Sequence, residues 1–193
     1  MVEIDARKLE CPKPVLLTKA ETDKGTEELR VQVDNEVAVG NVTRFLESAG
    51  YEAKREDAPD GKSFFITGRK TGEAARKSAD KKTTAILFAS DTLGAESDGL
   101  GEVLIKAYLG TIAKADEPPA TVALMNAGVK LALPESSTFD TLKEIEARGT
   151  KILVCGTCTN HFGITDKIKV GVISNMFEIA GSLMSADKTI VHG

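Results

Sequence analysis

The chain has 193 residues and a net charge of −4 at pH 7, which is room for one large or two small domains. Its acidity and its 5% aromatic content argue against a nucleic-acid-binding protein. No apolar run approaches the roughly 20 residues that cross a bilayer, and the charged N-terminus does not predict a signal peptide. Three cysteines are too few for a disulfide framework, so we expect reduced thiols and a cytoplasmic protein.

The first third of the chain predicts the order βαβαββ. Its two helices begin at Pro12, where proline suits the first helical position, and after Asp34 or Asn35, either of which can cap a helix. Gly50 ends the second helix. Four short segments are apolar or alternate between apolar and polar residues, as strands do, namely residues 2–4, 29–33, 51–55 and 63–67.

A cysteine lies at the predicted start of the first helix, in Cys11-Pro12-Lys13-Pro14. If the helix begins at Pro12, Cys11 is the N-cap and faces unpaired backbone N–H groups and the positive end of the helix dipole. Both favour a thiolate, so we expect the pKa of this thiol to lie below that of an ordinary cysteine. Lys13 and Lys19 add positive charge nearby. The chemistry expected is a nucleophilic sulfur that carries a sulfur atom, and the alternative is a small buried residue.

Residues 5–16, which read Asp-Ala-Arg-Lys-Leu-Glu-Cys-Pro-Lys-Pro-Val-Leu, resemble the signature of the TusA/SirA family of small sulfur-carrier proteins. The resemblance covers about the first third of the chain. It implies that Cys11 carries a persulfide, with Pro12 and Pro14 fixing the helix entry, and that two helices lie on one four-stranded sheet. The family usually has glycine where this chain has Lys8, so a left-handed turn there would fall on a lysine.

Residues 69–83 are predicted to be a linker. They contain six basic and two acidic residues and no large apolar one, whereas the segments on both sides are acidic. A solvated linker between two domains, residues 1–68 and 84–193, is the expected role, and a contact with nucleic acid is the weaker alternative.

From residue 84 onward, strands and helices alternate, which predicts an α/β domain with a parallel sheet. Ligands of such sheets bind beyond the carboxyl ends of the strands, where residues 91–101 and 125–128 fall. The glycines of residues 91–101 form neither a P-loop nor a dinucleotide fingerprint, and Asn126 fits either a turn or a site. The predicted strands are residues 84–89, 121–125, 152–154 and 189–191. The predicted helices are residues 103–112, 138–149 and 175–184.

A second cysteine motif, Cys155-Gly156-Thr157-Cys158, directly follows the third of these strands. Next to a βαβ pattern it suggests a redox pair, whose first cysteine can be acidified by a helix N-terminus. Zinc is another interpretation, with Cys155, Cys158 and His161 as ligands and His192 or Cys11 as the fourth. Two further interpretations are a structural pair of thiols, and sulfur chemistry in which His161 orients or deprotonates Cys158.

The second half resembles the DsrE-like family of sulfur-relay proteins, in its strand order and in Cys-Gly-Thr-Cys after a late strand. Both halves together are similar to YedF-type proteins associated with selenium metabolism. This implies a sulfur or selenium carrier that uses Cys11, with Cys155 and Cys158 as a second thiol site and no organic cofactor. The implied partners are a cysteine desulfurase or other sulfur- or selenium-relay proteins, and further copies of the chain bound through the DsrE-like half.

Two other functions remain open from the residues alone. One is a non-catalytic regulatory or binding module, in which the first domain docks a partner and the second binds a small ligand. The other is a thiol–disulfide reductase that uses Cys155 and Cys158 and does not need Cys11.

Overall fold

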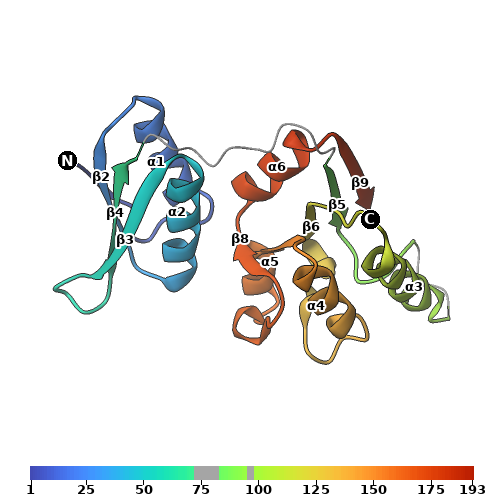
Figure 1. Cartoon of the computed structure of the whole chain (residues 1–193). Helices are drawn as coiled ribbons and strands as arrows, with labels where there is room; N and C mark the ends of the chain where they lie inside the picture. The colour runs from blue at the N-terminus through green and yellow to red at the C-terminus, as the bar shows by residue number, and fades with distance from the viewer. Residues whose placement is uncertain (72–82, 95–97) are drawn as a thin grey trace. The chain divides into compact units, whose positions relative to one another are not determined.

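The computed structural model describes residues 1–71, 83–94 and 98–193 (Figure 1). The chain divides into two compact units, Met1–Asp80 and Lys81–Gly193, and each is described by itself. Most of the predicted linker, residues 72–82, lies outside the described residues, as do residues 95–97 of the loop at 91–101.

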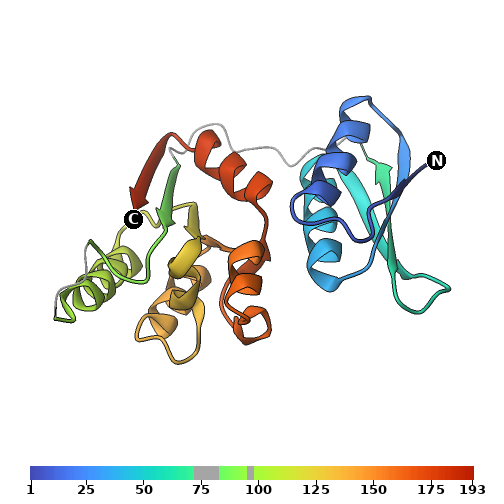
Figure 2. The same ribbon diagram turned by 180° about the vertical axis from the view of Figure 1, so that it is seen from behind.

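The first unit has the predicted order βαβαββ (Figure 1). Its four strands form one sheet in the order β1-β2-β4-β3, in which β1 is parallel to β2 and the other pairs are antiparallel. The two helices pack on each other and on this sheet, as the view from behind in Figure 2 also shows. The elements are β1 (Val2–Asp5), α1 (Lys13–Asp23), β2 (Glu28–Val33), α2 (Glu36–Ser48), β3 (Tyr51–Asp57) and β4 (Phe64–Lys70).

Local sequence features account for these boundaries. Leu29, Val31 and Val33 of β2 have no exposed surface, so the alternating pattern identifies the face that packs on the helices. The side chain of Asn35 accepts a hydrogen bond from the Ala38 N–H at 2.8 Å, which makes Asn35 the cap of α2. Gly50 follows this helix with a φ of 83°, a conformation that glycine adopts without strain.

The second unit is an α/β domain whose five strands are all parallel, in the order β8-β7-β6-β5-β9. All four residues of β6 are buried, because this central strand is covered on both faces. The strands are β5 (Thr84–Phe88), β6 (Thr121–Leu124), β7 (Lys151–Cys155), β8 (Val172–Ser174) and β9 (Lys188–His192). The helices are α3 (Leu100–Lys114), α4 (Phe139–Ala147), α5 (Gly156–His161) and α6 (Met176–Ser185), with 3-10 segments η1 (Asn126–Ala132) and η2 (Thr165–Lys167).

The predicted strands and longer helices of this unit are present, and the sequence missed β8, α5, η1 and η2. Among the described residues, none of the helices is long and apolar enough to span a membrane.

Candidate functional site

Cys11 lies just before α1, one residue further from the helix than predicted. The helix begins at Lys13, and its N-cap is Pro12, which has non-helical dihedral angles. The Pro12 carbonyl accepts the first helical hydrogen bond, from the Leu16 N–H at 3.1 Å, which is what defines an N-cap residue. The expectation that Cys11 itself is the N-cap was therefore wrong, and the predicted acidity of its thiol stays a prediction.

The Cys11 thiol is half-buried beside a small hollow between the beginnings of the two helices of the first unit. The hollow has a volume of about 40 Å³ and is lined by Pro12 and Pro14 on one side and by Asn35 and Ala38 on the other. About 10–15 Å³ suffices for one water molecule, so a single added atom fits beside the thiol.

Two hydrogen bonds fix the first part of the loop that leads from β1 to Cys11. The Ala6 N–H donates to the Gln32 carbonyl at 2.8 Å, and the Lys8 N–H donates to the Asp34 carboxylate at 2.8 Å. Lys8 has a φ of 59°, so the lysine adopts the left-handed conformation for which glycine is usually required. Of the predicted basic residues, Lys13 is exposed and Lys19 is paired with Asp23.

The second cysteine pair lies at the carboxyl end of β7. Cys155 is the last residue of this strand and is 2% exposed, whereas Cys158 is half-buried within α5. The two Sγ atoms are 3.1 Å apart, and both residues are in the thiol form. The backbone N–H of Asn126, which follows the neighbouring strand β6, donates to the Cys158 Sγ at 3.2 Å.

The electrostatic surroundings of Cys155 differ from the expectation. Burial raises the pKa of its thiol to about 11, the neighbouring Cys158 adds to this rise, and backbone N–H groups of α5 offset only part of it. The expectation that the first cysteine of the motif is acidified was therefore wrong, because desolvation outweighs the helix N-terminus at a fully covered position.

The structure does not bring His161 to the thiols. His161 is exposed at the end of α5, and its ring packs edge-on against Phe162 at a centroid distance of 5.1 Å. His192 lies in the edge strand β9, which β5 and β6 separate from β7; its ring stacks on Phe88 and meets the ring of Tyr108 edge-on. Among the described residues, no group of three or more His, Cys, Asp or Glu side chains is placed to hold a metal ion, so the zinc interpretation has no support.

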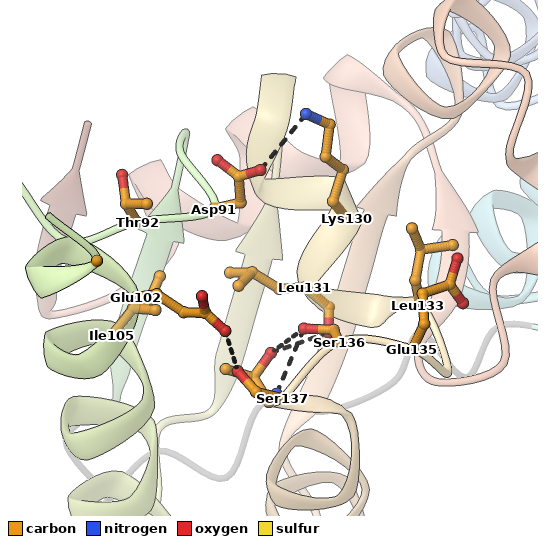
Figure 3. A pocket seen from close by; sticks show the side chains of 12 residues that line it. Asp91, Thr92, Glu102, Ile105, Lys130, Leu131, Leu133, Glu135, Ser136 and Ser137 are labelled. Atoms are coloured by element: carbon orange, nitrogen blue, oxygen red, sulfur yellow. Dashed lines mark hydrogen bonds and ion pairs between the residues drawn. The ribbon is translucent and has the colours of Figure 1, made fainter. Parts of the chain in front are cut away.

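A larger pocket lies beyond the carboxyl ends of β5 and β6 (Figure 3). Its volume is about 460 Å³, and none of the three cysteines lines it. Lys130 pairs with Asp91 at 3.4 Å across its upper edge, and Ser137 donates to Glu102 at 3.0 Å across its lower edge. The Lys130 Nζ also lies 5.0 Å from the centre of the Phe162 ring, just after α5. The placement of this pocket agrees with the general rule for strand ends, and the loop at 91–101 that was expected at this edge contributes Asp91, Thr92 and Gly99 to its lining. No motif indicated the lining residues between 130 and 138.

Comparisons with known proteins match the two units separately. Residues 2–70, which include Cys11, match the family model of the sulfurtransferase TusA, and residues 102–192, which include Cys155 and Cys158, match that of the DsrE/DsrF-like family. The chain joins a TusA/SirA-like domain to a DsrE-like domain. These two domains indicate a role in sulfur relay.

Three solved structures are similar to part of this chain. A SirA-like protein from Desulfitobacterium hafniense is 29% identical over 36% of this chain and 96% of its own, with a TM-score of 0.32. The ychN protein from E. coli is 22% identical over 57% of this chain and 99% of its own, with a TM-score of 0.43. A conserved protein of unknown function from Bacteroides thetaiotaomicron is 16% identical over 60% of this chain and 99% of its own, with a TM-score of 0.42. The comparison with curated proteins gave no match.

Proposed function

We propose that this chain carries sulfur or selenium in the cytoplasm as a persulfide or perselenide on Cys11, and that Cys155 and Cys158 form a second thiol site. The observation that carries the proposal is the half-buried Cys11 thiol in the TusA-like domain, beside a hollow with room for one more atom. Lys13 is exposed next to it and favours an anionic sulfur.

Loading of Cys11 is a sulfur-transfer step between two thiols. The Cys11 thiolate attacks the outer sulfur of a donor persulfide, so a new S–S bond forms and the S–S bond of the donor breaks. The electron pair of the broken bond stays on the donor sulfur, which leaves as a thiolate and takes up a proton. We propose that the donor is a cysteine desulfurase or another sulfur- or selenium-relay protein. We also propose that the chain binds further copies of itself through the DsrE-like domain.

Intact-mass spectrometry of the full chain after incubation with a cysteine desulfurase and cysteine tests this function. We expect a gain of one sulfur atom that maps to the peptide containing Cys11. Cys11→Ser should keep its circular dichroism spectrum and lose this gain, while Thr22→Ser, at the far end of α1, serves as a matched control that keeps it. Wild-type protein that gains no sulfur at Cys11 would contradict the proposal. Repeating the incubation with a selenium donor in place of cysteine tests whether the same thiol takes up selenium.

A second candidate function is favoured by the distance of 3.1 Å between the Sγ atoms of Cys155 and Cys158. A thiol–disulfide reductase cycles between two such thiols and a disulfide. In that case Cys11→Ser would leave disulfide reduction intact, and the double variant Cys155→Ser, Cys158→Ser would abolish it.

A further inference from the structure

We propose that Cys158, and not Cys155, is the thiol of the second site that accepts a sulfur atom, and that Asn126 is a positioning residue whose backbone N–H holds the Cys158 sulfur as an anion. This inference rests on the proposed function, because it assigns roles within the second thiol site.

The two sulfur atoms differ in access to solvent. Cys155 ends a buried strand and is 2% exposed, whereas Cys158 is half-buried on the outer side of the pair. An incoming persulfide therefore reaches Cys158 first. Asn126 is itself exposed, so the hydrogen bond from its N–H to the Cys158 Sγ lies at the surface, where a reaction partner can approach.

The Asn126 N–H is held in place before any reaction. Asn126 has a φ of 47°, a strained conformation for a residue with a side chain, and such strain persists only where the surroundings impose it. The flanking residues show this constraint, because the Met125 N–H donates to the Phe88 carbonyl at 2.9 Å. A Cβ atom on Gly128 would lie 2.3 Å from the same carbonyl oxygen, so the backbone of η1 at Gly128 packs closely against the end of β5.

A hydrogen bond to a charged acceptor is stronger than one to a neutral acceptor, so this donor favours a thiolate at Cys158. The partner thiol is less ready to react. Burial raises the pKa of Cys155 to about 11, so Cys155 keeps its proton near neutral pH, and its sulfur lies 3.1 Å from that of Cys158.

Two balanced steps follow from this arrangement. In the first, the Cys158 thiolate attacks the outer sulfur of a persulfide, the S–S bond of the donor breaks, and the donor leaves as a thiolate. In the second, Cys155 loses its proton and attacks the Cys158 Sγ, which releases the carried sulfur as HS⁻. The two cysteines are oxidised to a disulfide and the carried sulfur is reduced by two electrons, so no other reductant is needed in that turnover.

The first experiment measures alkylation of the full-length protein by iodoacetamide near neutral pH, with each cysteine followed by peptide mass mapping. We expect Cys158 to react at least about tenfold faster than Cys155, since each unit of pKa changes the thiolate fraction about tenfold. Asn126→Val, which disfavours a positive φ, should slow Cys158 by about tenfold, as expected for loss of a hydrogen bond to a charged group. Asn126→Gly, which adopts the same φ without strain, should restore the rate.

Asp98→Val is the matched control, because Asp98 also has a side chain and a positive φ, of 49°, but precedes α3 and not η1, which carries Asn126. It introduces the same kind of strain and should leave the alkylation rate of Cys158 unchanged. A folded Asn126→Val protein with the wild-type rate at Cys158, or a wild-type protein that reacts faster at Cys155, would overturn the inference.

The second experiment decides the assignment even where Asn126→Val does not fold. Full-length Cys155→Ala and Cys158→Ala are each incubated with cysteine persulfide, and the added sulfur is located by mass. We expect Cys155→Ala to keep sulfur on Cys158, and Cys158→Ala to gain none in the DsrE-like domain. Sulfur on Cys155 of Cys158→Ala overturns the inference but leaves the proposed function standing. A wild-type chain that gains no sulfur at any cysteine defeats the proposed function itself.

Discussion

Cys155 is held at the end of β7 with almost no exposure to solvent, and this placement changes how its thiol ionises. Burial raises its pKa from 9.0 to about 11. A thiol whose pKa is higher in the folded chain than in the unfolded chain keeps its proton up to a higher pH when the chain is folded. Between the two values the unfolded chain has lost this proton and the folded chain has not, so rising pH favours unfolding.

We therefore expect the contribution of Cys155 to stability to be fully present below pH 9 and to be lost as the pH rises to about 11. The loss should be about 1–2 kcal/mol, allowing for partial solvent screening. Urea unfolding of wild-type and Cys155→Ala protein across this range measures it, because the stability advantage of the wild type should shrink. Val154→Ala, the same kind of truncation at the adjacent buried residue, is the control and should show a constant difference. A Cys155→Ala difference that is equally constant would contradict the expectation.

Single residues show both what the sequence could predict and what it could not. Asn35 was one of the two caps predicted for α2, because a capping side chain needs only its own helix to act. The left-handed turn at Lys8 was anticipated from a family pattern, although the lysine itself gives no signal of it. The interpretation in which Cys155 is acidified was wrong, because the pKa of this thiol depends on burial by segments that are remote in the sequence. Similarly, no motif shows that the Asn126 N–H meets Cys158.

At the scale of elements, η1 is positioned by a close approach between two backbones. Gly128 lies within this segment, and a Cβ atom there would come within 2.3 Å of the Phe88 carbonyl oxygen of β5. Because the obstacle is backbone, it cannot move aside as a side chain would. The close approach also fixes the turn that carries Asn126.

We expect Gly128→Ala to lower the free energy of unfolding by about 1–3 kcal/mol, as overpacking commonly does. Gly110→Ala is the matched control, because Gly110 lies within α3 and, in the described part of the chain, no atom beyond the backbone of its own helix lies within 4 Å of a Cβ atom there. It should raise stability by about 0.5–1 kcal/mol, since alanine favours a helix interior over glycine. Chemical denaturation measures the free energy of unfolding of both variants. Equal effects of the two substitutions would show that the close contact with Phe88 does not affect stability.

The elements that the sequence missed are those whose formation depends on distant partners. β8 has only three residues and exists through its pairing with β7. Gly171, just before it, has a φ of 76° and packs against Ile152 of β7, a contact that no local pattern indicates. By contrast, α3 and α4 were predicted from apolar residues at helical spacing, of which Leu109, Ile112, Leu142 and Ile145 are buried, although Val103 and Leu104 of the same pattern are exposed.

At the scale of the whole molecule, the chain places three thiols in two compact units. Composition alone suggested this division, because residues 69–83 are basic and poor in large apolar residues between two acidic segments. For the same reason we expect trypsin to cut first between Arg69 and Lys82, which would leave one fragment with Cys11 and another with Cys155 and Cys158.

These two fragments allow a test of sulfur transfer between the domains. A tether raises the effective concentration of one thiol near another to about the millimolar range, so transfer within one chain can be faster than transfer between chains in dilute solution. We therefore expect sulfur loaded on Cys11 to move to the second fragment with a rate that does not depend on protein concentration. The chain is loaded with persulfide, digested with trypsin at intervals, and the mass of each fragment is followed over time.

Two results would contradict this relay. Sulfur that never leaves the Cys11 fragment, together with a Cys155→Ser, Cys158→Ser variant that delivers sulfur to an acceptor as fast as the wild type, would mean that the second site takes no part in delivery. A transfer rate that rises in proportion to protein concentration would instead show transfer between chains. In that case the link between the domains would not speed the reaction, since tethering increases only the encounter rate of thiols on the same chain.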